Sequence, residues 1–154
     1  MSFNGWQDYA LSVGAGVAKL DQSNTHPSWA LGVRGMPGFT AWAGLTQIGM
    51  PTAGETIVAA AATGPVGATV GQIGNFLGCR VVGIAGGREK CSFAVDEFGF
   101  DACINHKEKD LAEKLTEETP DGIDVYFENV GDKVLNAIIP LLNPDARAPV
   151  CGIV

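Results

Sequence analysis

The sequence has few charged residues, and one long stretch has none. Charged residues make up 18% of the 154 positions, and the net charge is -7. No run of Lys and Arg offers a basic face, so we expect no nucleic-acid partner. The charge-free stretch from Thr56 to Cys79 is interrupted by five glycines, by Pro65 and by Thr and Gln. Such a composition is not typical of a lipid-facing helix, and we expect no membrane span.

Cysteine-based motifs and a secretory signal are also lacking. Cys79, Cys91, Cys103 and Cys151 form no Cys-x-x-Cys pair and have no His at ligand spacing, so we expect no metal site. The N-terminus has no basic flank followed by an apolar run. Three of the four cysteines lie within or beside predicted strands, which favours small buried thiols over disulfides. We therefore expect reduced cysteines and a cytoplasmic protein.

Residues from about 55 onward alternate between apolar strands and helical segments. The 46% hydrophobic content and the length suit one folded core rather than a disordered chain. Five alternations predict an α/β fold, a Rossmann-type doubly wound parallel sheet with five strands. The expected strands are Thr56–Ala62, Arg80–Ala85, Ala102–Asn105, Ile123–Glu128 and Ala148–Val154. The expected helices between them are Val66–Leu77, Glu89–Phe98, Lys107–Glu118 and Lys133–Leu142, the last ended or kinked by Pro140.

The first 55 residues have a different pattern and no core of their own. Trp6–Leu11 alternates loosely like an edge strand, residues 21–28 have the composition of a loop, and Phe39–Ile48 is a candidate helix. We interpret this part as the end of another domain followed by a connecting helix.

A glycine-rich turn follows the first predicted strand. It reads Gly64-Pro65-Val66-Gly67. One glycine lets the chain turn sharply after the strand, and a second lets backbone amides approach a pyrophosphate. The start of the next helix adds free N–H groups and the positive end of its dipole, and Pro65 suits the first helical turn. A chain with 21 glycines could use such a motif for packing alone, but its position between strand and helix favours nucleotide binding.

The end of the second strand indicates which nucleotide is bound. An NAD site usually presents Asp or Glu here, about 20 residues beyond the turn. This chain has Gly86 and Gly87 instead, and Lys90 follows as a cation for a 2′-phosphate. Arg88 is a further cation, or a solvated surface charge, and Glu89 fits a helix N-terminus facing solvent. The pattern favours NADP(H) over NAD.

Three later segments supply further candidates. Asn129, after the fourth strand, is placed to bond a nicotinamide ribose, or else it is a turn residue. His106, after the third strand, would stack on adenine, reach the ribose phosphate or be an ordinary loop residue. Cys151–Ile153 lies beside the expected nicotinamide pocket, and for the Cys151 side chain we expect a buried core position. No Ser-His-Asp or Cys-His pattern indicates a catalytic residue.

Several segments together resemble a known family. They resemble the zinc-independent branch of the medium-chain dehydrogenase/reductases, and within it the leukotriene B4 dehydrogenase or prostaglandin reductase group and the bacterial NADPH-dependent curcumin reductases. The segments are Gly35–Trp42, Ala60–Gly74, Gly78–Gly87, Glu89–Cys91 and Phe127–Gly131. The resemblance implies reduction of the activated C=C bond of an enone or alkenal, with hydride delivered from NADPH to the β-carbon.

The resemblance also implies roles for single residues. Gly64 to Gly67 match the pyrophosphate turn, Lys90 the 2′-phosphate lysine, and Asn129 the asparagine of a Glu/Asp-Asn-Val-Gly motif. Cys151, Gly152 and Ile153 match a backbone segment that lines the nicotinamide. His106 lies where many members have Tyr.

Family members are about twice as long as this chain. The resemblance thus implies that residues 1–35 are the remnant of an N-terminal, barrel-like catalytic domain. Residues 36–154 would be a linker helix and an NADP-binding domain that stops after strand five, taken from a parent that forms a homodimer. We expect this piece to bind NADPH without full activity. Open alternatives are a non-catalytic nucleotide-sensing or assembly module, a quinone reductase with a quinone-like substrate, and an alcohol dehydrogenase.

Overall fold

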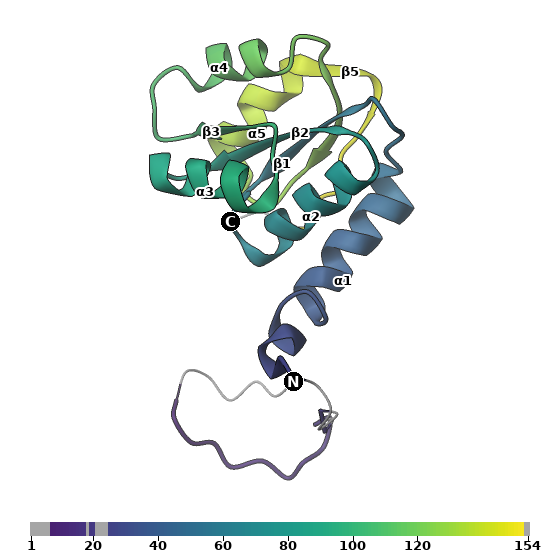
Figure 1. The fold of residues 1–154 in the computed structure, drawn as a ribbon, viewed down its shortest axis with the longest axis vertical. Coiled ribbons are helices and arrows are strands. Elements are labelled where there is room, and N and C mark those ends of the chain that lie inside the picture. The colour runs from purple at the N-terminus through teal and green to yellow at the C-terminus, as the bar shows by residue number, and fades with distance from the viewer. Residues whose placement is uncertain (1–6, 18, 21–24, 153–154) are drawn as a thin grey trace.

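The centre of the molecule is a five-stranded parallel sheet. The computed structural model describes residues 7–17, 19–20 and 25–152. The strands are β1 (Thr56–Ala60), β2 (Arg80–Ala85), β3 (Ala102–Asn105), β4 (Ile123–Phe127) and β5 (Leu142–Arg147). Their order is β3-β2-β1-β4-β5, and every neighbouring pair is parallel (Figure 1). The predicted α/β, Rossmann-type class is confirmed.

Helices cover both faces of the sheet because successive strand residues point to opposite sides. On one face, alternate strand residues such as Ile57 and Ala59 pack with residues of α1, α2 and α3. On the other face, Val58 and Ala60 pack with residues of α4 and α5. The helices are α1 (Met36–Ala43), α2 (Pro65–Phe76), α3 (Arg88–Phe98), α4 (Leu111–Glu118) and α5 (Asp132–Ile138). The order of the strands reverses between β1 and β4, the position at which doubly wound folds open a crevice.

Most predicted elements match the structure, and the differences lie mainly at element ends. The α4 helix begins at Leu111, four residues later than expected, because residues 106–110 form turns. The expected break at Pro140 is confirmed, since α5 passes into the short helix η3 (Ile139–Leu141). The four cysteines are free thiols. No helix in the described ranges is long and apolar enough to span a bilayer.

The N-terminal part lies outside the sheet. Figure 1 shows α1 running beside α2 and leading to a segment that extends away from the α/β body. The expected helix over 39–48 is confirmed as α1 followed by the π-helical turn η2 (Gly44–Gly49). The expected edge strand is wrong where it can be compared, because residues 7–11 are exposed and form no strand, while Trp6 lies outside the described residues. Pro27 and Ser28, expected as the end of a loop, instead begin the short helix η1 (Pro27–Leu31).

The position of the fifth strand differs from the prediction. The apolar composition of residues 148–154 indicated a strand there, but β5 consists of Leu142–Arg147, and only Val150 forms an isolated bridge, to Glu128. Pro144 is tolerated because β5 is the last strand of the described sheet and need not donate on its outer side. The register shifts between Ile123 and Val125, so the pairing is irregular.

An ion pair between Arg147 and Glu55 anchors β5. The guanidinium donates to both carboxylate oxygens of Glu55, at 2.9 and 2.6 Å, and its Nε donates to the carbonyl of Gly49 at 2.8 Å. Both side chains are about three-quarters buried. Hydrogen bonding to Arg147 therefore holds the pKa of Glu55 below its ordinary value.

We expect Arg147→Met to lower the free energy of unfolding by about 1.5–3 kcal/mol at pH 7, because charge-assisted bonds of this kind are lost. The pair stabilises the fold above about pH 4.3, where Glu55 is ionised in folded and unfolded chains alike. This stability is lost as the pH falls through the lower pKa of folded Glu55. Urea unfolding from pH 7 to pH 3 measures both effects, and an unchanged pH dependence in the variant would contradict the assignment.

Candidate cofactor-binding site

The turn after β1 brings the start of α2 against the end of the strand. Ala61 has a left-handed backbone with φ of +52°, and its carbonyl accepts the N–H of Gly64 at 2.8 Å. A Cβ on Gly67 would lie 2.3 Å from that same carbonyl oxygen. Only glycine therefore fits at position 67 without moving the helix. This close approach leaves the first amides of α2, at Val66 and Gly67, at the carboxyl edge of the sheet.

The turn after β2 is held by a side chain from the next strand. Gly87 has a φ of +122°, and its N–H donates to Oδ1 of Asn105 at 2.8 Å. The same oxygen accepts the N–H of Lys107 at 3.2 Å. Asn105 was not among the sequence candidates, although its place at the end of a strand, just before His106 and Lys107, was the available signal. It fixes the shape of the loop that carries the predicted phosphate contacts.

A cleft of about 390 Å³ opens at the carboxyl ends of β1, β2 and β3. It brings together four of the predicted residues, Gly64, Gly86, Lys90 and His106. A Cβ on Gly86 would come within 3.0 Å of Nε2 of His106, so the absence of a side chain keeps this end open. Val130, beside Asn129, forms part of the opposite wall.

The two cations after β2 have different surroundings. Arg88 is 92% exposed and lies 3.8 Å from Oε1 of Glu108, which also pairs with Lys114. Hydrogen bonding to Lys114 holds the pKa of Glu108 below its ordinary value. Lys90 has no ion-pair partner among the residues that the structure describes, and it lines the cleft. Lys90 is thus a cation available to an anionic ligand, as is Lys107, which lines the same cleft and has no ion pair among the described residues either.

Asn129 and Gly152 lie at the reversal point between β1 and β4. The side-chain amide of Asn129 donates to the carbonyl of Ala60 at 3.1 Å, which ties the two strand ends together. Gly152 lies beside it, since a Cβ there would be 3.5 Å from the Asn129 carbonyl oxygen. Ile153 lies outside the described residues. The expected burial of Cys151 is wrong: its thiol is exposed, because residues 148–151 run past the end of β4 instead of forming a covered strand.

Sequence reasoning also missed Glu128, a carboxylate that is only 1% exposed. It accepts the hydroxyl of Tyr126 and the N–H groups of Val130 and Gly131. Burial and the neighbouring carboxylate raise the pKa of Tyr126. A charged residue directly after a run of buried strand residues was the signal that could have revealed it.

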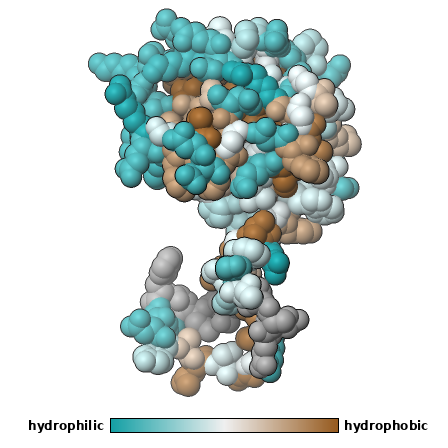
Figure 2. All heavy atoms as spheres, viewed as in Figure 1, coloured by the Kyte–Doolittle hydropathy of each residue, from teal (hydrophilic) through white to brown (hydrophobic). Residues whose placement is uncertain are grey.

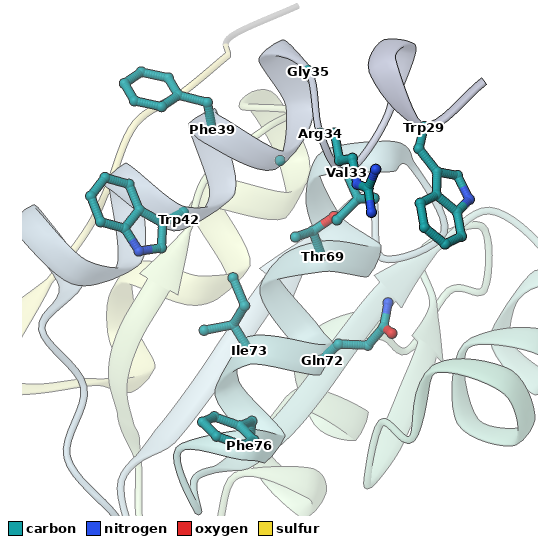
Figure 3. A pocket seen from close by; sticks show the side chains of 11 residues that line it. Trp29, Val33, Arg34, Gly35, Phe39, Trp42, Thr69, Gln72, Ile73 and Phe76 are labelled. Atoms are coloured by element: carbon teal, nitrogen blue, oxygen red, sulfur yellow. The ribbon is translucent and has the colours of Figure 1, made fainter. Parts of the chain in front are cut away.

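A larger hollow lies away from these residues, between α1 and α2. This α1–α2 groove has a volume of about 810 Å³, and Figure 3 shows aromatic side chains of both helices along it. Of its four aromatic residues, Phe39, Trp42 and Phe76 are at least half exposed, and Trp29 is 41% exposed. Figure 2 shows hydrophobic surface where α1 meets the α/β body. None of the predicted cofactor residues lines it. It is therefore a separate apolar surface.

The reversed strand order, with a glycine turn at the reversal point, defines a Rossmann-type domain. A family model described as zinc-binding dehydrogenase matches residues 65–154, more than half of the sequence. The chain belongs to this family. Within the described ranges no three His, Cys, Asp or Glu side chains come together to hold a metal, so those residues do not fit a zinc ion.

Comparisons with known proteins confirm the expected resemblance. The chain is 59% identical to the NADPH-dependent curcumin reductase of Escherichia coli (strain K12) over all of its 154 residues, which cover 45% of that protein. It is 42% identical to prostaglandin reductase 1 of Oryctolagus cuniculus, covering 99% of this chain and 44% of that one. The crystal structure of CurA from Vibrio vulnificus in complex with NADPH matches 97% of this chain and 44% of its own, with 62% identity and a TM-score of 0.89. The chain thus spans about half the length of these relatives.

Proposed function

We propose that this chain is the NADPH-binding part of a reductase that acts on activated carbon–carbon double bonds. The observation that carries the proposal is the cleft in which Gly64 of the glycine turn, Gly86, Lys90 and His106 meet at the carboxyl ends of parallel strands. Ligands of doubly wound sheets bind at this edge. Similarity to proteins named for NADPH-dependent reduction supports the same cofactor.

The residues of the cleft, of the turn before α2 and of the reversal point would each contact one part of NADPH. The first amides of α2 would hold the pyrophosphate, which approaches closely because Gly64 and Gly67 have no side chains. Lys90 would bind the 2′-phosphate, and His106 would contact the adenosine end. Asn129, with the backbone of Cys151, Gly152 and Ile153, would border the nicotinamide. When bound there, NADPH supplies a hydride, which in an enone goes to the β-carbon.

The substrate class rests on the relatives. Their names include a curcumin reductase, a 2-alkenal reductase and a prostaglandin reductase. We therefore propose a small enone or alkenal, or a quinone-like compound, as the substrate of the parent protein. We further propose that the parent is a cytoplasmic homodimer.

The domain division is part of the same proposal. Residues 1–35 would belong to a catalytic domain, and residues 36–154 to a linker helix and the cofactor domain. The exposed apolar residues of the α1–α2 groove support this division, because a neighbouring domain packed there would remove them from water. The two tyrosines give no proton donor, since Tyr126 is buried against Glu128 and Tyr9 lies exposed in a segment without regular structure.

A fluorescence titration of the purified 154-residue chain tests the proposal. We expect NADPH to bind at least about tenfold more tightly than NADH, since one charge-assisted contact to the 2′-phosphate accounts for such a ratio. We expect negligible reduction of an enone by the same sample. Equal affinities for the two nucleotides, or no binding of either, would overturn the cofactor assignment, and rapid enone reduction would overturn the incomplete substrate site.

A further inference from the structure

The end of β4 is organised around one buried carboxylate. Oε1 of Glu128 accepts the N–H of Val130 at 2.5 Å and that of Gly131 at 2.8 Å, and Oε2 accepts the hydroxyl of Tyr126 at 2.9 Å. Glu128 is 1% exposed and Tyr126 is fully buried. Both oxygens are thus satisfied, which offsets the cost of keeping a charge away from water.

The backbone of Glu128 connects this turn to the segment after β5. Its N–H donates to the carbonyl of Pro149 at 3.0 Å, and its carbonyl accepts the N–H of Cys151, also at 3.0 Å. One residue therefore holds two segments at once: the turn that begins at Asn129, and the chain that leads to Gly152.

We propose that Glu128 and Tyr126 are positioning residues for the nicotinamide end of the cofactor site, an inference that rests on the proposed function. Glu128 accepts the N–H groups of Val130 and Gly131, so both amides face the same side of the turn. This fixes the backbone from which Asn129 reaches the carbonyl of Ala60 at the reversal point of the sheet. Tyr126 holds the carboxylate from the core side, where its hydroxyl donates to Oε2. Because both side chains are buried, they would act on the cofactor through Asn129 and the 151–152 backbone and not by direct contact.

A carboxylate suits this arrangement because its two oxygens accept all three hydrogen bonds, whereas a carboxamide has only one accepting oxygen. Charge-assisted bonds are roughly twice as strong as neutral ones. In Glu128→Gln the side chain keeps its size and can still accept the two amides, but only through neutral bonds. In Tyr126→Phe the ring still fills the core, and Oε2 of Glu128 is left without its donor.

Two ligands separate this role from general stability. NADPH occupies both ends of the proposed site, whereas adenosine 2′,5′-bisphosphate occupies only the adenosine end. We expect Glu128→Gln and Tyr126→Phe to bind NADPH about five- to tenfold more weakly, because the nicotinamide contacts are misaligned. Binding of the bisphosphate should stay within about twofold of wild type.

Asp124→Asn serves as the matched control. Asp124 lies on the same strand, but at its other end, where it accepts the N–H of Thr56 and the side-chain amide of Asn143, both at 2.8 Å. This variant should change the thermal midpoint and leave the ratio of the two ligand affinities as in wild type. If Glu128→Gln does not fold, Tyr126→Phe still tests the positioning role of the two residues.

The outcomes are distinct. Wild-type NADPH affinity in folded Glu128→Gln and Tyr126→Phe overturns the positioning role and leaves the proposed function standing. A parallel loss of both ligands also overturns it, because that pattern marks a residue needed only for the fold. Failure of the wild-type chain to bind either ligand instead overturns the proposed function itself.

Discussion

Replacing Lys90 with alanine should weaken NADPH binding by about ten- to a hundredfold and leave NADH binding within about twofold. Lys90 lines the cleft from the first turn of α3 and has no ion-pair partner in the described part of the chain. A charge-assisted contact to phosphate contributes about 1.5–3 kcal/mol, which sets the size of the effect. Fluorescence titration with both nucleotides measures it.

Arg88 is the matched control for Lys90. It lies two residues earlier in the first turn of the same helix, but it is almost fully exposed and faces Glu108. Arg88→Ala should lower NADPH affinity less than about threefold. An ionic contact made by a side chain as exposed as Arg88 contributes little to binding. Equal losses of NADPH affinity in the two variants would mean that only the overall charge at the start of α3 determines binding. Unchanged NADPH affinity in Lys90→Ala would rule out this lysine as the 2′-phosphate ligand.

Local patterns predicted the sheet well wherever strands are apolar. The bounds of β2 and β3 match the prediction, because buried parallel strands consist of short apolar runs between helices. β5 was missed for the opposite reason. Its sequence contains Asn143, Pro144 and Asp145, and it is held by Arg147, whose partner Glu55 lies 92 residues away. An interaction over that separation leaves no local signal in the sequence.

The same distinction applies to the candidate site. The convergence of Gly64, Gly86, Lys90 and His106 in one cleft was predictable because each comes soon after the end of a strand, and the carboxyl ends of parallel strands meet at one edge. Glu128 and Asn105 were missed because they bind backbone amides of turns instead of facing the cleft. The exposure of Cys151 depended on the true bounds of β5, so that expectation failed together with the strand.

Gly67→Ala should abolish most cofactor binding and also destabilise the fold. The added Cβ would lie 2.3 Å from the oxygen and 2.8 Å from the carbon of the Ala61 carbonyl. These are backbone atoms of a residue that already has a φ of +52°, so they cannot turn away as a side chain can. The start of α2 must therefore move away from β1, at a cost of about 1–3 kcal/mol.

This movement displaces the amides that would bind the pyrophosphate. Loss of two charge-assisted bonds predicts an affinity for NADPH lower by about a hundredfold or more. Gly74→Ala is the control within the same helix, because its Cβ would meet the side-chain ends of Ile57 and Val81, at 2.8 and 3.0 Å, far along α2 from the turn. That variant should lose stability in urea unfolding yet bind NADPH nearly as well as wild type. Normal NADPH binding by folded Gly67→Ala would show that the pyrophosphate does not bind at this turn, whatever the change in stability.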